Sequence, residues 1–253
     1  MTDAIVTENR DAILRIEMRR PERKNALTQA MYSALAAALD QGEADASVRA
    51  MLIHGQPGMF TAGNDVKDFL ENPKKDLDAP VFQFLRRLIR ARKPIVAAVS
   101  GNAVGVGTTM LLHCDYVVAD ESARFAVPFT SLGVCPEAAS SVSLALVIGW
   151  RRASEMLMLG QPVDAATALD WGLVNRVVPA AELAAAAATQ ARAFAAQPVQ
   201  AMRATKALLR DRLLPIYEKA LADEAGEFGR LLQTPDSQEA FRAFLEKRAP
   251  KFE

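Results

Sequence analysis

Residues 93–107 read KPIVAAVSGNAVGVG, and this stretch decides the fold class of the chain. It opens an uncharged run, residues 95–112, which approaches the length of about 18 residues at which a membrane-spanning helix is considered. Ser100, Gly101 and Asn102, followed by two more glycines and two threonines, interrupt this run. Such punctuation favours a buried strand, a glycine loop and the start of a helix over a span.

The residues before this stretch alternate between strand-like and helix-like patterns. Apolar residues between Ile5 and Met18 flank a polar turn, which predicts two paired strands. Thr28 is suited to cap a helix whose apolar residues Met31, Leu35 and Leu39 recur every four positions. The further elements expected are a strand at 48–54, a short helix at 65–70 and a helix at 80–92. This order predicts an α/β fold.

After the opening stretch the mixed pattern continues and then becomes helical. Strands are expected near residues 116–118, 124–127 and 174–177, with helices at 140–148 and 150–159. Four more helices are expected at 182–196, 199–210, 216–232 and 237–247. The shift predicts a core that carries the site over residues 1–197 and a helical region over residues 198–253.

Composition narrows the class of protein. The chain has 253 residues, 51% hydrophobic and 24% charged, as in a globular protein. Its 30 basic and 30 acidic residues leave no net charge, so we expect neither nucleic acid nor a membrane as partner. Two cysteines, Cys114 and Cys135, are too few for a disulfide framework or a structural zinc site, and no metal is expected. With no signal-like start, a cytoplasmic protein is expected.

The backbone N–H groups of two loops are the first candidates for a role in catalysis. The loops read FTAGND at residues 60–65 and NAVGVG at residues 102–107, and each is expected to follow a strand and precede a helix. Unpaired N–H groups at such a place can stabilise negative charge on a bound carbonyl oxygen. The alternative is that both are ordinary strand-to-helix turns. Neither loop has the spacing of a phosphate-binding motif.

Four motifs, in order, carry a resemblance to a known family. They read RPERKNAL at 20–27, FTAGNDVKDF at 60–69, the stretch already quoted at 93–107, and DAATALDWGLVNRVVP at 164–179. Together they resemble the crotonase (enoyl-CoA hydratase/isomerase) superfamily over nearly the whole chain. The resemblance implies a ClpP-like spiral of strand-strand-helix units with a C-terminal helical region for oligomerisation. It also implies an oxyanion hole formed by the N–H groups of Ala62 and Val106.

The position of acidic residues bears on the reaction. Hydratases of this superfamily use two glutamates, and the matching positions here hold Thr109 and Phe129. Neither residue can act as a carboxylate base, so water addition by that route is disfavoured. The segment VPFTSLGVCPEAASS, residues 127–141, resembles instead the peroxisomal 3,2-enoyl-CoA isomerases, whose single glutamate follows a proline. This resemblance implies that Glu137 carries the proton transfer.

The resemblance extends to the substrate and the assembly. It implies an acyl-CoA thioester substrate, with coenzyme A as part of the substrate and no separate cofactor, and a homotrimer or a dimer of trimers. The substrate contacts implied are Arg23, Lys24, Ala26, Gly63, Asn64, Asp65, Val66, Gly105, Phe129, Leu132 and Lys247. Structural alternatives exist for several: Arg23 and Lys24 can form a solvated turn, and Asp65 can cap a helix. Glu137 can instead lie in the first turn of a helix, where its negative charge interacts favourably with the helix dipole.

Other functions remain as alternatives. One is an enoyl-CoA hydratase, or another enolate reaction, with Asp65 as a source of the acid. Another is an acyl-CoA binder without catalysis. A serine hydrolase built on Ser100, His113 and Asp115 is disfavoured, because no strained nucleophile elbow surrounds Ser100.

Overall fold

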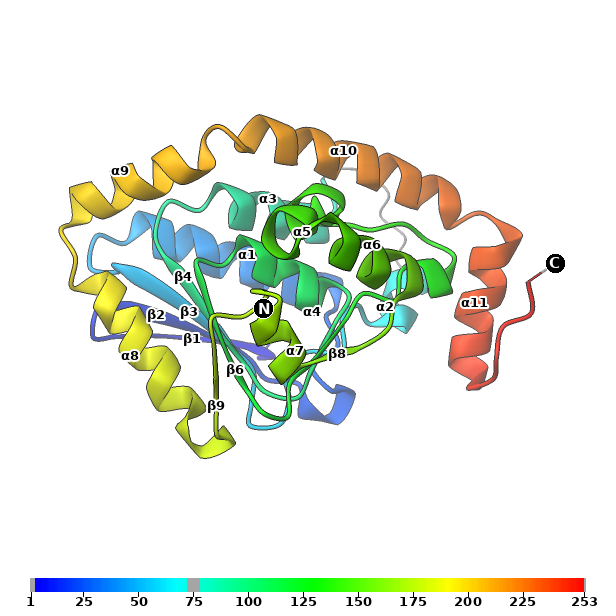
Figure 1. Cartoon of the computed structure of the whole chain (residues 1–253), viewed down its shortest axis with the longest axis horizontal. Helices are drawn as coiled ribbons and strands as arrows, with labels where there is room; N and C mark the ends of the chain where they lie inside the picture. Colours follow the sequence, from blue (N-terminus) through cyan, green and yellow to red (C-terminus); the bar gives the residue numbers. More distant parts are fainter. Residues whose placement is uncertain (1–2, 72–77, 253) are drawn as a thin grey trace.

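The computed structural model describes residues 3–71 and 78–252 and contains two sheets (Figure 1). The larger sheet has the strand order β1-β2-β3-β4-β6-β9, in which β1 and β2 are antiparallel and all other neighbours are parallel. Its strands are β1 Ile5–Arg10, β2 Ile13–Met18, β3 Ala50–His54, β4 Ile95–Val99, β6 Tyr116–Asp120 and β9 Arg176–Val178. The smaller sheet has the order β5-β7-β8, with β5 Asn102–Val104, β7 Arg124–Ala126 and β8 Val163–Asp164.

A strand-strand-helix unit recurs along the chain. In one unit β4 joins the large sheet, β5 joins the small sheet and helix α4 follows at Val106–Thr109. In the next unit β6 and β7 repeat this division between the sheets, and helix α5 follows at Ser140–Ile148. Corresponding strands of the two units are parallel neighbours: β4 pairs with β6, and β5 pairs with β7. The segments that follow β5 and β7 therefore begin at the same edge of the small sheet.

Apolar side chains point alternately to the two faces of the large sheet, and both faces are buried. On one face Leu14 and Ile16 pack in the main core, which also contains residues of α1 Gln29–Ala44 and α3 Pro80–Arg90. On the other face Ile13, Leu52 and Val96 pack against α8, Leu183–Ala195. The remaining helices are α2 Val66–Glu71, α6 Trp150–Leu159, α7 Ala165–Asp170, α9 Val199–Arg210, α10 Leu214–Leu231 and α11 Pro235–Glu246, with short 3-10 turns η1 Pro21–Arg23, η2 Met110–His113, η3 Thr130–Leu132 and η4 Ala180–Glu182.

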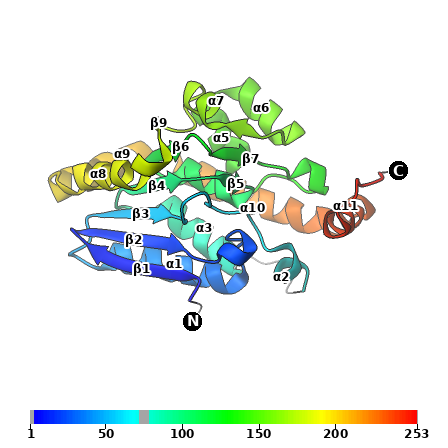
Figure 2. The same cartoon turned by 90° about the horizontal axis from the view of Figure 1, so that it is seen from below.

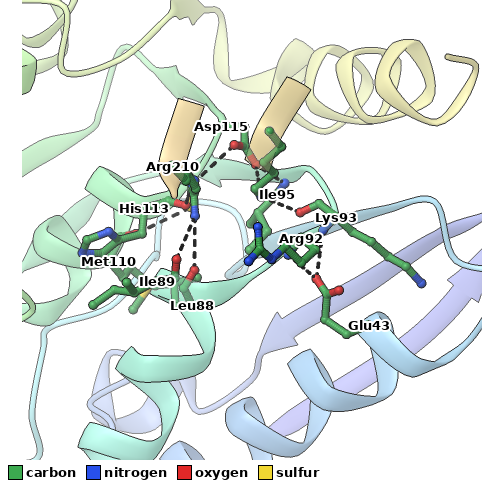
Figure 3. Close-up of polar contacts among 12 residues, drawn as sticks. Glu43, Leu88, Ile89, Arg92, Lys93, Ile95, Met110, His113, Asp115 and Arg210 are labelled. Atoms are coloured by element: carbon green, nitrogen blue, oxygen red, sulfur yellow. Dashed lines mark hydrogen bonds and ion pairs between the residues drawn. The ribbon is translucent and has the colours of Figure 1, made fainter. Parts of the chain in front are cut away.

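The C-terminal helices follow the core along one side, and α11 lies at one end of the molecule (Figures 1 and 2). Arg210, the last residue of α9, anchors them by donating to the carbonyl of His113 and to Oδ1 of Asp115, the latter at 3.3 Å (Figure 3). Lys206, one turn earlier, lies 2.6 Å from Oδ2 of Asp115. Because Asp115 also accepts from the amide of Ile95 at 2.7 Å, this carboxylate joins α9 to the start of β4.

Most expected elements are confirmed, including the hairpin, the Thr28 cap and the helices at 140–148, 150–159 and 199–210. The uncharged run at 95–112 divides into β4, β5, α4 and η2, and none of the described helices is long and apolar enough to cross a membrane. The interpretation of 102–104 as loop was wrong, because these residues pair in parallel with β7. β8 and α7 were not expected, α3 ends at Arg90 rather than 92, and β9 lies at Arg176–Val178 rather than 174–177.

Candidate active site

The two glycine loops lie side by side. The Thr61 amide donates to the Asn102 carbonyl at 2.9 Å, and the Val104 amide donates to the Thr61 carbonyl at 3.1 Å. Gly63 has a φ of +87°, and a Cβ on it would lie 2.7 Å from the carbonyl oxygen of Val104. Glycine is therefore required at Gly63 by backbone conformation and by space, and it lets the loops approach closely.

The available amides are not quite those expected. The N–H of Ala62 donates to the carbonyl of Lys24 at 2.9 Å, so the assignment of Ala62 to an oxyanion hole is wrong. Two residues further on, beyond the left-handed Gly63, the N–H of Asn64 has no acceptor among the described residues. The same holds for the N–H of Val106, the first residue of α4, where helix geometry leaves amides unpaired. Asn64 and Val106 thus each offer a free donor, one on each loop.

Glu137 lies inside the protein, with 7% of its surface exposed. The hydroxyl of Thr109, at the end of α4, donates to its Oε1 at 3.0 Å. Burial raises the pKa of Glu137 to about 7, and the nearby charge of Glu224 acts in the same direction, whereas the Thr109 hydrogen bond lowers it. A carboxyl group with this pKa exchanges protons readily near neutral pH, as a general acid-base must.

Glu137 does not serve as the cap of α5. The amides at the start of that helix, those of Ala139 and Ser141, donate to the carboxylate of Glu224 from α10 instead. The side chain of Glu137 is bonded to Thr109 alone among the described residues. The helix-dipole interpretation of Glu137 therefore finds no support in its hydrogen bonds.

Tyr32, on α1, is hydrogen-bonded to the first glycine loop. Its hydroxyl donates to Oδ1 of Asn64, and its side chain is fully inside the core. Burial is the main reason that the pKa of Tyr32 lies well above its ordinary value, and the charge of Glu137 raises it further.

Apolar side chains of the segment before Glu137 pack into the main core. Phe129 and Val134 are buried, and Leu132 packs partly buried against the same core. The ring of Phe129 lies beside Gly105, where an added Cβ would be 3.9 Å from a ring carbon. Gly105 itself has a φ of +56° and donates its amide to the Ala126 carbonyl, which directs the chain into α4.

The turn at residues 20–27 packs against the first loop and exposes its charges. Arg23 and Lys24 are exposed, whereas Ala26 is half-buried. The amide of Leu27 donates to the carbonyl of Gly63 at 2.8 Å, which ties the turn to the loop. Arg23 and Lys24 thus lie exposed on a turn that is hydrogen-bonded to the first loop, in a place open to a charged ligand.

Asp65, Val66 and Lys247 have other surroundings. Asp65 forms an ion pair with Arg20 at 2.7 Å and accepts from the amide of Asp68 at 3.2 Å, so it caps α2. Val66 is the first residue of α2 and packs against the core. Lys247 is exposed at the end of α11, in a left-handed conformation, and no contact joins it to the glycine loops in the described part of the chain.

The residues considered for a serine hydrolase do not form a triad. The hydroxyl of Ser100 donates to Asp120 and accepts from the amide of Gly58. His113 is bonded to the carbonyl of Ala138, and burial lowers its pKa to about 4. Asp115 forms ion pairs with Lys206 and Arg210, as described above. No group of acidic, histidine or cysteine side chains in the described ranges could hold a metal ion.

Three residues of this region were not singled out in the sequence. Tyr32 holds Asn64, Arg20 holds Asp65, and Glu224 holds the amides that follow Glu137. Only Glu224 has a clear signal, because it stands among Ala220, Leu221 and Ala225 on the buried stripe of a predicted helix. A carboxylate in an apolar stripe needs buried donors.

Comparisons with known proteins agree with this geometry. A profile of the family described as enoyl-CoA hydratase/isomerase matches residues 8–253. The 2,3-dehydroadipyl-CoA hydratase of Escherichia coli is 34% identical over 256 residues, covering 100% of this chain and 99% of that protein. The 1,2-epoxyphenylacetyl-CoA isomerase of the same species is 33% identical over 260 residues, with coverages of 100% and 99%. An enoyl-CoA hydratase/isomerase structure from Pseudoalteromonas atlantica has a TM-score of 0.94 at 36% identity, covering 99% of this chain and 100% of that one.

Proposed function

Because the chain is an enzyme of the enoyl-CoA hydratase/isomerase family, with the crotonase fold, we propose that it shifts the double bond of a 3-enoyl-CoA to give trans-2-enoyl-CoA. The observation that carries this proposal is Glu137, a buried carboxyl with a pKa of about 7, whose Oε1 accepts from the hydroxyl of Thr109 and whose other oxygen has no hydrogen bond in the described part of the chain. Coenzyme A belongs to the substrate, and no further cofactor takes part.

The reaction needs one group that moves a proton from the α carbon to the γ carbon, on the far side of the β carbon. Ionised Glu137 removes a proton from the α carbon of the thioester, and the electron pair moves onto the carbonyl oxygen as an enolate. The enolate then collapses, the double bond forms between the α and β carbons, and Glu137 returns the proton to the γ carbon. One carboxyl suffices because it is regenerated in each turnover.

The free amides of Asn64 and Val106 would receive the thioester oxygen. The charge that develops on that oxygen is stabilised by N–H donors already directed at it, and loss of one such donor costs about 2.7–4 kcal/mol in other enzymes. We assign this role to the amide of Asn64 and not to that of Ala62, because the Ala62 amide donates to the carbonyl of Lys24. The close approach of Gly63 to the carbonyl of Val104 holds the loop that carries Asn64 against the loop that leads to Val106.

Hydration of a 2-enoyl-CoA is the second candidate, favoured by the hydratase name of a relative at 34% identity. It requires a group that activates water in addition to one that protonates carbon. Thr109 and Phe129 supply no carboxylate, and Asp65 is held by Arg20 and the start of α2. The available acids therefore favour the isomerase, or another enolate reaction with one base. A protein that only binds acyl-CoA would not need a carboxyl group with a pKa near 7.

The rest of the substrate and the assembly follow from the surroundings. The exposed Arg23 and Lys24 would pair with the phosphates of coenzyme A beside the first loop. The helices of residues 198–253 expose large apolar side chains, including Leu208, Leu209 and Ile216, and would form a trimer or a pair of trimers. In that assembly Lys247 would reach a neighbour's site. Light scattering that finds a stable monomer would contradict this assembly.

Product analysis in deuterated water tests the activity. The wild type should convert 3-enoyl-CoA to the trans-2 isomer and should add little water to 2-enoyl-CoA. Glu137→Gln should abolish the conversion and still bind a saturated acyl-CoA. Glu121→Gln, which changes an exposed glutamate after β6, is the matched control and should behave as wild type. Wild-type turnover by Glu137→Gln, or rapid hydration by the wild type, would contradict the proposal.

A further inference from the structure

We propose that Glu224, on α10, is a positioning residue for Glu137: its carboxylate clamps the strained turn that carries Glu137. The inference rests on the proposed function of Glu137 for its consequence in catalysis. The clamp itself is a feature of the described residues, and it links the C-terminal helices to the candidate active site.

Three donors converge on the carboxylate of Glu224. The amide of Ala139 lies 2.6 Å from Oε2, and the amide and hydroxyl of Ser141 lie 2.9 and 2.5 Å from Oε1. Glu224 is 7% exposed, and no cation pairs with it in the described part of the chain. A carboxylate that only accepts suits this set of donors, because every polar atom that faces it donates.

The turn held by these bonds is one that ordinary side chains avoid. Ala138 and Ala139, directly after Glu137, have φ values of +62° and +56° although neither is glycine. Such backbone conformations persist where the surroundings hold them. His113 holds the same turn from the other side, since its Nε2 lies 2.7 Å from the carbonyl of Ala138. The direction of the Glu137 side chain is therefore fixed by partners on η2 and α10.

Helix α10 brings Glu224 to this place through its packing. Ala220, Leu221 and Ala225 are buried around it, and α10 lies against α5. The Sγ of Cys135 lies 3.6 Å from the carbonyl of Glu224. An alanine or leucine would complete the apolar stripe more simply. The carboxylate costs burial free energy at this position, and its three donors belong to the segment that carries Glu137.

The charge of Glu224 also acts on Glu137 directly. The titratable groups that influence one another here are Glu224 on α10, Tyr32 on α1 and Cys135, with His113 one hydrogen bond away from the turn. Burial keeps Tyr32 and Cys135 neutral at neutral pH, because it raises the pKa of both. His113, with a pKa of about 4, is neutral as well. Burial raises the pKa of Glu224 too, whereas the hydrogen bonds from Ser141 and Ala139 lower it and favour its charged form. The charge on Glu224 opposes ionisation of Glu137 and so raises its pKa.

Variants at Glu224 separate the clamp from the charge. Glu224→Gln keeps the size but removes the charge and one acceptor. Glu224→Asp keeps the charge but withdraws it by one methylene. Glu227→Gln, on the next turn of α10, changes an exposed glutamate that pairs with Arg230 and is the matched control. For each variant we would measure amide hydrogen exchange at residues 138–141, the titration of the Glu137 carboxyl by carbon-detected NMR, assigned with Glu137→Gln, and kcat and KM.

The expected results differ between the variants. Glu224→Gln should titrate Glu137 at lower pH, speed exchange at Ala139 and Ser141, and lower kcat by about tenfold to a hundredfold with little change in KM. Glu224→Asp should speed the exchange and leave the titration near that of wild type. Glu227→Gln should change none of these.

Distinct outcomes overturn distinct statements. Unchanged titration and exchange in Glu224→Gln would overturn the role of Glu224, and unchanged exchange in Glu224→Asp would do so if the Gln variant failed to fold. A wild type that does not isomerise 3-enoyl-CoA would overturn the proposed function instead, and the titration and exchange would still decide the role of Glu224.

Discussion

The hydroxyl of Thr109 lies 3.0 Å from Oε1 of Glu137, and this contact joins the helix after the second glycine loop to the segment that carries the buried carboxyl. The position that holds a glutamate in hydratases of the superfamily thus holds a donor to the remaining glutamate. A hydroxyl donor favours the ionised form of Glu137, whereas burial favours the protonated form. The Thr109 hydrogen bond therefore keeps Glu137 ionised in a fraction of the enzyme molecules at neutral pH, where it can accept a proton.

Replacement of Thr109 by Val should move the pH dependence of the reaction upward. The variant keeps the shape of the side chain but loses the donor, so the pKa of Glu137 rises above about 7. Because Glu137 must be ionised to act as base, the rising limb of kcat/KM should move to higher pH. Below neutrality kcat/KM should fall about tenfold for each pH unit by which this limb moves. Thr189→Val, on the exposed side of α8, is the control. An unchanged pH profile for Thr109→Val would contradict the role of this bond.

Glu137 should also lower the stability of the protein above neutral pH. Its pKa is about 4.5 when unfolded and about 7 in the fold, so the fold favours the protonated form. Stability is therefore lost as pH rises from 4.5 through 7. Glu137→Gln removes this loss and should be more stable than wild type by up to about 3 kcal/mol near pH 8. Urea unfolding at several pH values measures the difference, which should vanish near pH 4. An equal difference at all pH values would contradict the assignment.

The sequence predicted those features that depend on local patterns. Apolar periodicity located α5, α6 and α9 at their observed bounds, and the resemblance pointed to Glu137, which proved to be buried. The free amide of the first loop was misassigned, because the engagement of Ala62 depends on Lys24, which lies far from it along the chain. The strand β5 was missed because only its pairing with β7 distinguishes three residues from a loop.

The partners of the residues that support the site could not be found by such reasoning. Tyr32 reads as one more residue of an amphipathic helix, and nothing local indicates that its hydroxyl reaches Asn64. Glu224 lies more than eighty positions from the amides that it holds. Their roles arise from packing between distant segments, which hydrophobic periodicity does not specify.

Tyr32→Phe should weaken catalysis through Asn64. The change removes the hydroxyl that donates to Oδ1 of Asn64 and leaves that oxygen without its partner in the described structure. The backbone of Asn64 should then hold its N–H less well for the thioester oxygen, and we expect kcat to fall about tenfold, equal to about 1.4 kcal/mol. Tyr116→Phe, a tyrosine that packs against Phe194 near α8, is the control. If both variants have the same kcat, Tyr32 has no part in holding Asn64.

Gly63→Ala tests the close approach of the two glycine loops, and Gly58 offers a matched control. Both glycines have left-handed conformations, with φ of +87° and +75°, so alanine should cost each about 1–2 kcal/mol of stability. A Cβ on Gly63 would also lie 2.7 Å from the Val104 carbonyl, whereas a Cβ on Gly58 would meet nothing within 4 Å. Gly63→Ala must therefore push the loops apart, at a further cost of about 1–3 kcal/mol, and displace the amide of Asn64. Urea unfolding and turnover should both be affected more strongly than in Gly58→Ala, and equal effects in the two variants would show that the loops tolerate separation.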